Sequence, residues 1–491
     1  MPLVLAILLA VSLQAAPRLS MEQRLNQLRK SPPELYAFLL RMPKGGDLHN
    51  HLSGAAYAES IVKAAADNGL CVDKGSLAVV RPAKAGLCRL PDQVDAATAN
   101  NDNQTFNALI DAFSMRGFVP GRESAHDHFF NTFNLFSPAT SPATAIFVAE
   151  LARRAADQNE SYLELMALAG NGPISALGAK AGFDGNFEET AAKLRAAGLP
   201  DLVAALKTKV DDAENTSRSL LHCDTDPGSA PCHVTIRYIY QVLREFPKEQ
   251  VFAQVLAGFQ IASIDPRVVA INFVQPEDGI NSMRNYHLHM QMVDFAKRLY
   301  PNVHITLHAG ELAPGLVPPE GLRFHIREAV DLGHAERIGH GVDIMYENDA
   351  VGLLNQLRSK HIAVEVNLTS NDVILGVKGN DHPFPVFRKY GVPVVISTDD
   401  EGVNRSHLTL EYQRAVLTYG LAYADLKQMV RNSLEYSFLS GASFWTDATY
   451  RSTAKACATG LTSKACEDFL AGSDKARAQA DLERRFHQFE K

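Results

Sequence analysis

Eight short apolar runs recur along this chain, with amphipathic segments between them. The runs are rich in Val, Ile and Leu and show little alternation, which is typical of parallel strands buried on both faces. Residues 321–332 and 347–360, which lie between such runs, carry apolar side chains at helical spacing. The runs span residues 46–52, 162–168, 234–242, 268–274, 303–307, 337–340, 363–368 and 392–398.

From the third run onward the repeat is about 30 residues, enough for a strand, a helix and two loops. Eight such units predict an α/β fold, the (β/α)8 TIM barrel. An open doubly wound sheet is the alternative, but no Gly-rich phosphate-binding turn follows the first run. The first two gaps are wider, so we expect insertions at about 60–140 and 175–232. We expect these insertions and a helical tail after Trp445 to belong to one barrel domain over residues 17–491.

The composition is that of an ordinary globular protein, with 46% apolar and 21% charged residues in a chain of 491. The net charge of −7 is spread over this length, so we expect neither a nucleic-acid nor a membrane-surface partner. The sequence has no low-complexity run and no fixed-period repeat, which argues against solenoids and propellers.

The N-terminus predicts export. An apolar run at residues 3–13 is too short to span a bilayer, and the small residues Ala15 and Ala16 follow it, as in a signal peptide. We therefore expect a signal peptide over residues 1–16 and a periplasmic or secreted protein. No Lys or Arg precedes the run, so a buried N-terminal helix is the alternative.

The six cysteines form three local pairs along the chain, and only nearest-neighbour pairing closes short loops everywhere. Such pairing predicts three disulfides, each clamping an excursion from the main fold, in an oxidising compartment. Six unrelated reduced thiols are the alternative. Metal binding by these cysteines is disfavoured because no C-x-x-C spacing occurs. The predicted pairs are Cys71 with Cys88, Cys223 with Cys232, and Cys457 with Cys466.

Metal ligands are candidates at the ends of the predicted strands. His49 and His51 are two apart, so their side chains point to the same side of a strand. His308 and Asp399 also end strands and can meet them at the carboxyl-terminal mouth of a barrel. Three imidazoles and one carboxylate suit Zn²⁺ with a water completing the shell, so we expect one zinc ion per chain.

Two further strand-end residues suggest proton transfer. Glu311, one short turn beyond His308, can reach a substrate, and His340 can hold or deprotonate the metal-activated water. Other histidines allow plainer interpretations. The pair at 287 and 289 falls in a helical pattern and belongs to surface or core, and the pair at 126 and 128 lies beside phenylalanines. We expect His304, on the same side as His308, to be a packed interior residue.

Together these motifs resemble the adenosine deaminase family, a branch of the amidohydrolase barrels. The resemblance covers roughly residues 40–440, and the lead-in Met-Pro-Lys-Gly at 42–45 is similar to the secreted, growth-factor-type branch. The matching stretches are 42–55, His-Ala-Gly-Glu at 308–311, Arg-Ile-Gly-His-Gly at 337–341, Ser-Thr-Asp-Asp at 397–400 and 432–438.

The resemblance implies roles that agree with the reading of the residues. The four candidate ligands would bind zinc, and protonated Glu311 would donate to ring nitrogen 1 of a purine. His340 would orient the attacking hydroxide, and Asp400 would accept a hydrogen bond at ring nitrogen 7. Ser53 stands where the family has an aspartate toward the sugar, and Gln275 stands where a glycine N–H contacts the purine. Glu401 follows Asp400 in place of a frequent proline.

The resemblance therefore implies a hydrolase that converts adenosine or 2′-deoxyadenosine to the inosine product and ammonia. A small purine nucleoside is the expected partner, and the oligomeric state, a homodimer included, is left open. One alternative is deamination of another 6-aminopurine, such as adenine, a modified nucleoside or a nucleotide, which Ser53 and Arg405 would favour. The other alternative is a secreted nucleoside-binding or signalling protein on the same fold, in which the disulfide-clamped insertions would bind partners.

Overall fold

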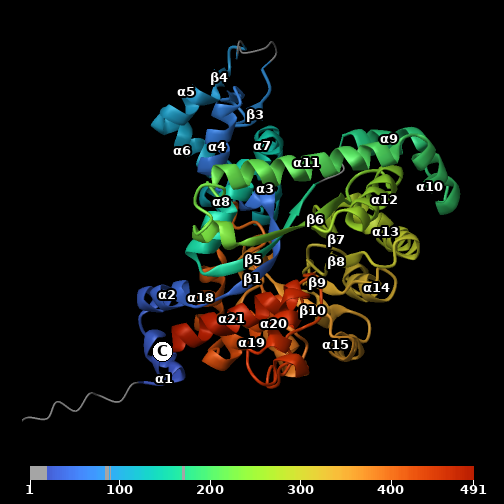
Figure 1. The fold of residues 1–491 in the computed structure, drawn as a ribbon. Coiled ribbons are helices and arrows are strands. Elements are labelled where there is room, and N and C mark those ends of the chain that lie inside the picture. Colours follow the sequence, from blue (N-terminus) through green and yellow to red (C-terminus); the bar gives the residue numbers. More distant parts are fainter. Residues whose placement is uncertain (1–18, 83–87, 89, 169–171) are drawn as a thin grey trace, which may run out of the picture.

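Eight parallel strands form one sheet in the computed structural model, which describes residues 19–82, 88, 90–168 and 172–491 (Figure 1). Each strand pairs with the next in chain order, and every pair is parallel. The strands are β1 (Gly45–His51), β5 (Glu160–Ala167), β6 (Thr235–Leu243), β7 (Val268–Val274), β8 (His304–Ala309), β9 (Arg337–His340), β10 (Ala363–Val366) and β11 (Val394–Ile396).

The last strand returns to the first at the carboxyl-terminal end of the sheet. The Asp399 N–H donates to the His49 carbonyl over 2.8 Å, and the His51 N–H donates to the Asp399 carbonyl over 3.1 Å. These bonds pair Asn50 with Asp399 in a parallel bridge. The predicted (β/α)8 barrel is confirmed, and its closure sets chain segments from opposite ends of the sequence side by side.

Helices pack around the outside of the barrel (Figure 1). The helices are α8 (Thr144–Asp157), α12 (Lys248–Ile264), α13 (Ile280–Leu299), α14 (His325–Asp331), α15 (Ala350–Ser359), α16 (Leu368–Leu375), α17 (Phe384–Tyr390), α18 (Leu408–Tyr419) and α19 (Tyr423–Glu435). Gly258 lies on α12 and permits this helix to pack closely on β6. A Cβ at this position would lie 2.5 Å from a ring carbon of Tyr240. Short 3-10 turns are η4 (Pro319–Leu322), η5 (Ile344–Tyr346) and η6 (Gly379–Asp381).

The first insertion lies between β1 and α8 and contains an antiparallel sheet in the order β3-β2-β4. The predicted disulfide between Cys71 and Cys88 is present in it. Its elements are α3 (Leu52–Ala55), α4 (Ala58–Asp67), β2 (Cys71–Asp73), β3 (Val79–Val80), β4 (Gln93–Asp95), α5 (Ala96–Asn101), α6 (Asn103–Ala112), η1 (Met115–Gly117), α7 (Ala125–Thr140) and η2 (Ser141–Ala143).

The second insertion lies between β5 and β6 and is helical. It contains α9 (Pro173–Ala181), α10 (Phe187–Ala196), α11 (Leu199–Leu220) and η3 (Ala230–His233). Helices α9 and α11 pack against α12, so α12 is buried along most of its length. The disulfide between Cys223 and Cys232 links the end of this insertion to the approach to β6.

The ends of the chain add helices at the amino-terminal side of the barrel. Before β1 lie α1 (Met21–Leu28) and α2 (Pro32–Arg41); after α19 lie η7 (Lys455–Cys457), α20 (Lys464–Ala471) and α21 (Asp474–Glu490). The third disulfide, between Cys457 and Cys466, clamps this tail as predicted. Three disulfides are typical of proteins from oxidising compartments. Residues 1–16, the predicted signal peptide, lie outside the described residues.

Within the described part of the chain, every helix is either too short or too polar to span a bilayer. Some predicted boundaries were wrong. The helical pattern at 321–332 splits into η4 and α14, and β10 and β11 are shorter than the runs that predicted them. The chain leaves β11 early because Asp399 adopts a left-handed backbone conformation, with φ of 63°.

Candidate functional site

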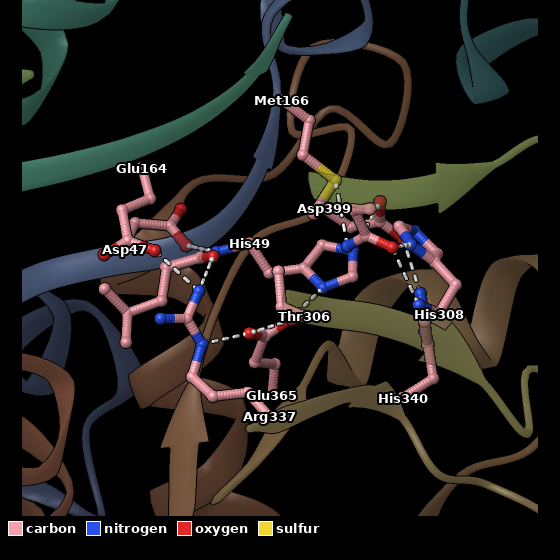
Figure 2. Close-up of polar contacts among 12 residues, drawn as sticks. Asp47, His49, Glu164, Met166, Thr306, His308, Arg337, His340, Glu365 and Asp399 are labelled. Carbon is pink, nitrogen blue, oxygen red and sulfur yellow. Dashed lines mark hydrogen bonds and ion pairs between the residues drawn. The ribbon is translucent and has the colours of Figure 1, made fainter. Parts of the chain in front are cut away.

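The four candidate metal ligands meet at the carboxyl-terminal mouth of the barrel. One ligand atom from each of His49, His51, His308 and Asp399 lies within 4.8 Å of the others, and all four residues are buried. The Asp399 Oδ1 atom is 3.5 Å from Nε2 of His49 and 3.2 Å from Nε2 of His51. The Nε2 atoms of His51 and His308 are 3.1 Å apart. Figure 2 shows the rings of His49 and His308 turned toward Asp399.

The outer nitrogens of these imidazoles are held by the protein. The Nδ1 atom of His49 lies 2.7 Å from Oε2 of Glu365, and Nδ1 of His308 lies 3.0 Å from Oδ1 of Asn272. Because carboxylate and amide oxygens are acceptors, both Nδ1 atoms carry the hydrogen, and both Nε2 lone pairs face the centre. The buried Nε2 of His49 has no hydrogen-bond partner among the described residues. The residues present therefore fit a bound metal ion, with supports typical of metal-ligating histidines.

A buried ion-pair network lies beneath the ligands (Figure 2). Arg337, on β9, donates from Nε to Glu365 over 2.5 Å and from Nη2 to Glu164 over 2.6 Å. Thr306 donates to the same Glu365 carboxylate over 2.9 Å. The three charged groups are almost fully buried. Their mutual pairing satisfies Glu365, so its second oxygen is fixed toward His49.

Glu311 lies beside the ligand cluster at the end of a tight turn after β8. Glu277 holds this turn, because its carboxylate accepts from the N–H groups of Gly310 and Glu311 over 3.0 and 2.9 Å. His325 also donates to Glu277, over 2.6 Å. The Oε1 atom of Glu311 is buried and lies 3.6 Å from Nδ1 of His340, and within the described part of the chain it has no hydrogen-bond partner. Glu311 is thus rigidly placed with a free carboxyl oxygen.

Burial raises the pKa of Glu311 well above its usual range, and the neighbouring Asp399 carboxylate raises it further. The pKa of Asp400 is raised well above its usual range by burial and by the Asp399 charge. Oδ1 of Asp400 is buried without a partner. At Gly54 a Cβ would lie 1.7 Å from that oxygen, so only glycine leaves room for Asp400 there. In both carboxyl groups, burial and the Asp399 charge favour the neutral, protonated form.

Glu401 is buried behind this pair and locks the loop in place. It accepts from Nδ2 of Asn50 over 3.2 Å and pairs with Arg154 over 3.0 Å. Asn50 stands between the two histidines of β1 and also donates to Thr398 over 3.0 Å. The loop that carries Asp399 and Asp400 is thus braced to β1 through side chains as well as through the backbone.

The cluster lies at one end of a cavity of about 1210 Å³. Ser53 and Gln275 line this cavity, as do Glu311 and Asp400. The outer wall comes from the two insertions: α7 contributes the aromatic residues Phe129, Phe130 and Phe133, and α11 contributes Leu206, Lys209, Asp212, Ala213 and Thr216. His126, from the pair beside the phenylalanines, also lines the cavity.

The adenosine deaminase family model matches residues 206–443, which include β6 to β11 and two of the four candidate ligands, His308 and Asp399. The match supports the adenosine deaminase family for this chain, over just under half of its length. An adenosine deaminase of Vibrio atlanticus is 32% identical over 204 residues, 41% of this chain and 56% of that protein. An adenosine deaminase of Clostridium perfringens is 29% identical over 212 residues, 42% of this chain and 54% of that protein. The chain thus spans just over half the length of these curated relatives.

Solved structures share the fold at low sequence identity. An adenine deaminase from Arthrobacter aurescens has a TM-score of 0.54 at 17% identity, covering 90% of this chain and 98% of that one. The N6-methyl-AMP deaminase from Arabidopsis thaliana has a TM-score of 0.53 at 19% identity, covering 82% and 94%. An amidohydrolase from Burkholderia ambifaria, with bound Zn, has a TM-score of 0.51 at 16% identity, covering 92% and 93%.

The prediction for His304 was wrong, and Arg405 has a partner within the protein. His304 is not a packed interior residue: its side chain is 46% exposed, stacks on Phe438 and pairs with Glu336. It begins β8 at the end of the barrel opposite the site, so sharing a face with His308 did not bring it near the ligands. Arg405, which could meet an anionic group but is more commonly a solvated loop residue, pairs with Glu59 over 2.7 Å.

The residues that hold the ligands and the turn before Glu311 were not predicted from the sequence. Glu365, Asn272 and Glu277 were not singled out for any role. A signal was present for two of them, because Glu365 and Asn272 are polar residues inside otherwise apolar strand runs. A polar group in such a run must be paired, and here the partners are the imidazole ligands. Which strand supplies which partner depends on barrel closure.

Proposed function

We propose that this protein is a zinc-dependent hydrolase that deaminates adenosine or 2′-deoxyadenosine to the inosine product and ammonia. The observation that carries the proposal is the free, buried carboxyl of Glu311 beside a cluster suited to a metal ion, both at the inner end of one cavity. A metal cluster alone would support many hydrolytic reactions. A rigid acid next to it supports attack on a ring that must first be protonated.

Three imidazoles and a carboxylate form a donor set that zinc favours, and the fold relative from Burkholderia ambifaria carries Zn. A zinc ion held by these four residues would lower the pKa of a water molecule and supply hydroxide near neutral pH. The reaction forms a carbon–oxygen bond at ring carbon 6, breaks the bond from that carbon to the amino nitrogen, and releases ammonia.

The residues around the cluster donate hydrogen to different atoms of the purine ring. Glu311, neutral because its pKa is raised, donates to ring nitrogen 1 and makes carbon 6 electron-poor. Ring nitrogen 7 of a purine is an acceptor, so Asp400 must donate to it rather than accept from it. The raised pKa of Asp400 supports that role. Ser53 and Gln275 line the cavity where the sugar and the purine edge would lie.

The charge of the cavity supports an uncharged nucleoside over a nucleotide. Among its described lining residues, Lys209 is the one Lys or Arg, and five side chains are carboxylic acids. A phosphate would need paired cationic groups, which are the usual means of phosphate recognition. Deamination of a nucleotide is thus the weaker alternative, although fold relatives include an N6-methyl-AMP deaminase.

The proposal is tested by following the ultraviolet spectrum of adenosine with purified, zinc-loaded protein. We expect conversion to the inosine spectrum, with 2′-deoxyadenosine close behind and AMP much slower. In the same assay Glu311→Gln should lower kcat by about 10²–10⁴-fold. It should retain zinc, because Glu311 is not a ligand. Glu336→Gln, which changes an outer carboxylate at the far end of the barrel, is the matched control. An unchanged adenosine spectrum with the metal-loaded protein would refute the proposal.

Export to the periplasm or the exterior belongs to the same proposal. The three disulfides and the apolar run at residues 3–13 support it. Expression of the full chain followed by cell fractionation and N-terminal sequencing tests it. We expect a processed protein that begins near residue 17 outside the cytoplasm, whereas an unprocessed cytoplasmic protein would contradict export.

A further inference from the structure

We propose that Asn371 and His382 are positioning residues, which hold His340 in the tautomer that carries its hydrogen on Nε2. They thereby make His340 a hydrogen-bond donor toward the reacting oxygen and not its base. The inference rests on the proposed function for its catalytic meaning. The sequence leaves both roles of His340 open, since a histidine there can either hold a water molecule or deprotonate it.

The chain of hydrogen bonds starts at a group whose donor character is unambiguous. The backbone N–H of Phe384 donates to Nδ1 of His382 over 3.0 Å. His382 is 2% exposed and begins the approach to α17. Because its Nδ1 accepts, the neutral ring carries its hydrogen on Nε2.

The next link fixes the side-chain amide of Asn371 on α16. Nε2 of His382 lies 3.0 Å from Oδ1 of Asn371, so the ring donates and the amide oxygen accepts. The amide orientation is thus set by the hydrogen-bond chain itself. Asn371 is fully buried, and its backbone N–H and carbonyl are engaged with Asn367 and Val377. Its Nδ2 group must therefore point the other way, toward the active site.

The last link reaches His340. Nδ2 of Asn371 lies 2.9 Å from Nδ1 of His340, and an amide nitrogen can only donate. Nδ1 of His340 is therefore an acceptor, and the hydrogen is on Nε2. That atom is buried, lies 3.7 Å from Oδ2 of Asp399 (Figure 2), and has no hydrogen-bond partner in the described ranges of the chain.

The position of Nε2–H decides what His340 can do. A nitrogen that already bears hydrogen has no lone pair for a proton from water, so it can only donate. Donated to a lone pair of the attacking oxygen, this bond orients the oxygen against carbon 6 of the purine. His340 also has φ of 70°, so its ring leaves β9 in a direction set by the left-handed backbone. Two residues from outside the barrel strands thus define its role.

The direct test is NMR of the zinc-loaded protein carrying isotopically labelled histidine, with the His340 signals assigned by difference from His340→Gln. We expect the wild-type ring to be protonated at Nε2 and unprotonated at Nδ1. Asn371→Leu removes the donor at similar volume, so the ring should show the other tautomer or a mixture. A purely structural role for Asn371 would leave the tautomer unchanged.

Kinetics give a second readout. Asn371→Leu should lower kcat by about 10²-fold and change KM by no more than about threefold. His382→Gln, which can still donate to the amide, should retain more activity than His382→Leu. His289→Phe is the matched control, because His289 is also buried but stacks on Phe273 away from the site. Metal content and Tm are measured for each variant, so that unfolding is recognised.

Hydrogen on Nδ1 of His340 in the wild-type protein would overturn the inference. So would a normal kcat in an Asn371→Leu protein that is folded and zinc-loaded. Failure of the proposed function is distinguishable, because the NMR tautomer is read without any substrate. If adenosine is not deaminated while the ring carries hydrogen on Nε2, the positioning stands and the assigned reaction falls.

Discussion

At the scale of single residues, the hydrogen-bond partners of the imidazoles would set how tightly the cluster holds a metal ion. Asn272 accepts from both the backbone N–H and Nδ1 of His308, over 2.9 and 3.0 Å. One amide oxygen thus fixes the rotamer and the tautomer of a ligand. Such partners hydrogen-bond to the ligands and do not touch the metal, yet they alter the affinity of the site for the metal.

Replacing Asn272 by Ala should lower zinc affinity by about 10–100-fold, because the His308 ring is then free to rotate and to change tautomer. Chelator competition on the purified protein measures the change. Asn348→Ala is the control, since Asn348 is exposed. Equal zinc affinity in the Asn272 variant and the wild type would contradict this role.

Glu277 links pH to stability through its ion pair with His325. Burial opposes its ionisation, but the hydrogen bond from His325 and the charge of that ring lower the pKa of Glu277 to about 2 from 4.5. A carboxyl group with a lowered pKa in the folded state stabilises the fold above its unfolded pKa. That contribution disappears as the pH falls from 4.5 toward 2.

We therefore expect Glu277→Gln to reduce the free energy of unfolding at pH 7 by on the order of 3 kcal/mol. The difference from the wild type should shrink as the pH falls below 4.5. Urea unfolding over a pH series measures both. A difference that stays constant down to the acid limit of folding would show that the charge of Glu277 is not its cause.

At the scale of elements, a buried lysine joins the end of α2 to the turn before β5. The Lys44 ammonium donates to the carbonyls of Leu39, Met42 and Gln158 over 2.6, 3.1 and 2.5 Å. The side chain is fully buried. It satisfies carbonyls left free where helices end, which is a favourable place for a cation.

Lys44→Met should lower the free energy of unfolding by about 3 kcal/mol, because several buried carbonyls lose their donor at once. Thermal or urea unfolding measures the loss. Lys63→Met is the matched control: Lys63 is exposed and pairs only with Asp67, so its loss should cost less than about 1 kcal/mol. Similar losses in both variants would argue against the capping role of Lys44.

At the scale of the whole molecule, two of the three disulfides clamp the insertions that form the outer wall of the cavity. Cys223 and Cys232 are nine residues apart and tie the loop after α11 to the chain that enters β6. α11 itself lines the cavity. The disulfide therefore restrains both the fold and the position of one wall of the site.

Replacing Cys223 and Cys232 together by Ser should lower the free energy of unfolding by about 2–3 kcal/mol, the value expected for a short closed loop. KM for the substrate should rise while zinc content stays unchanged, because the ligands come from barrel strands. Urea unfolding, steady-state kinetics and metal analysis check these outcomes. Loss of zinc in the double variant would show that the insertion also supports the metal centre.

The barrel could be predicted because its signal is local. Each strand is a run of apolar residues, and the spacing of the runs leaves room for one helix between them. The disulfides could be predicted for the same reason, since each joins neighbouring cysteines. Boundaries were less predictable: β11 ends early because the chain turns at Asp399 to meet β1.

The site could be predicted only in part. The sequence by itself determined which residues stand at strand ends, because a two-residue spacing and a strand terminus are local properties. The tertiary structure alone decided which side chains touch one another, such as Glu365 with His49 and Asn371 with His340. It also decided that His304 is far from His308 and that burial raises the pKa of Glu311. These properties depend on barrel closure, which brings distant segments of the chain together and excludes water. A short stretch of sequence cannot predict either effect.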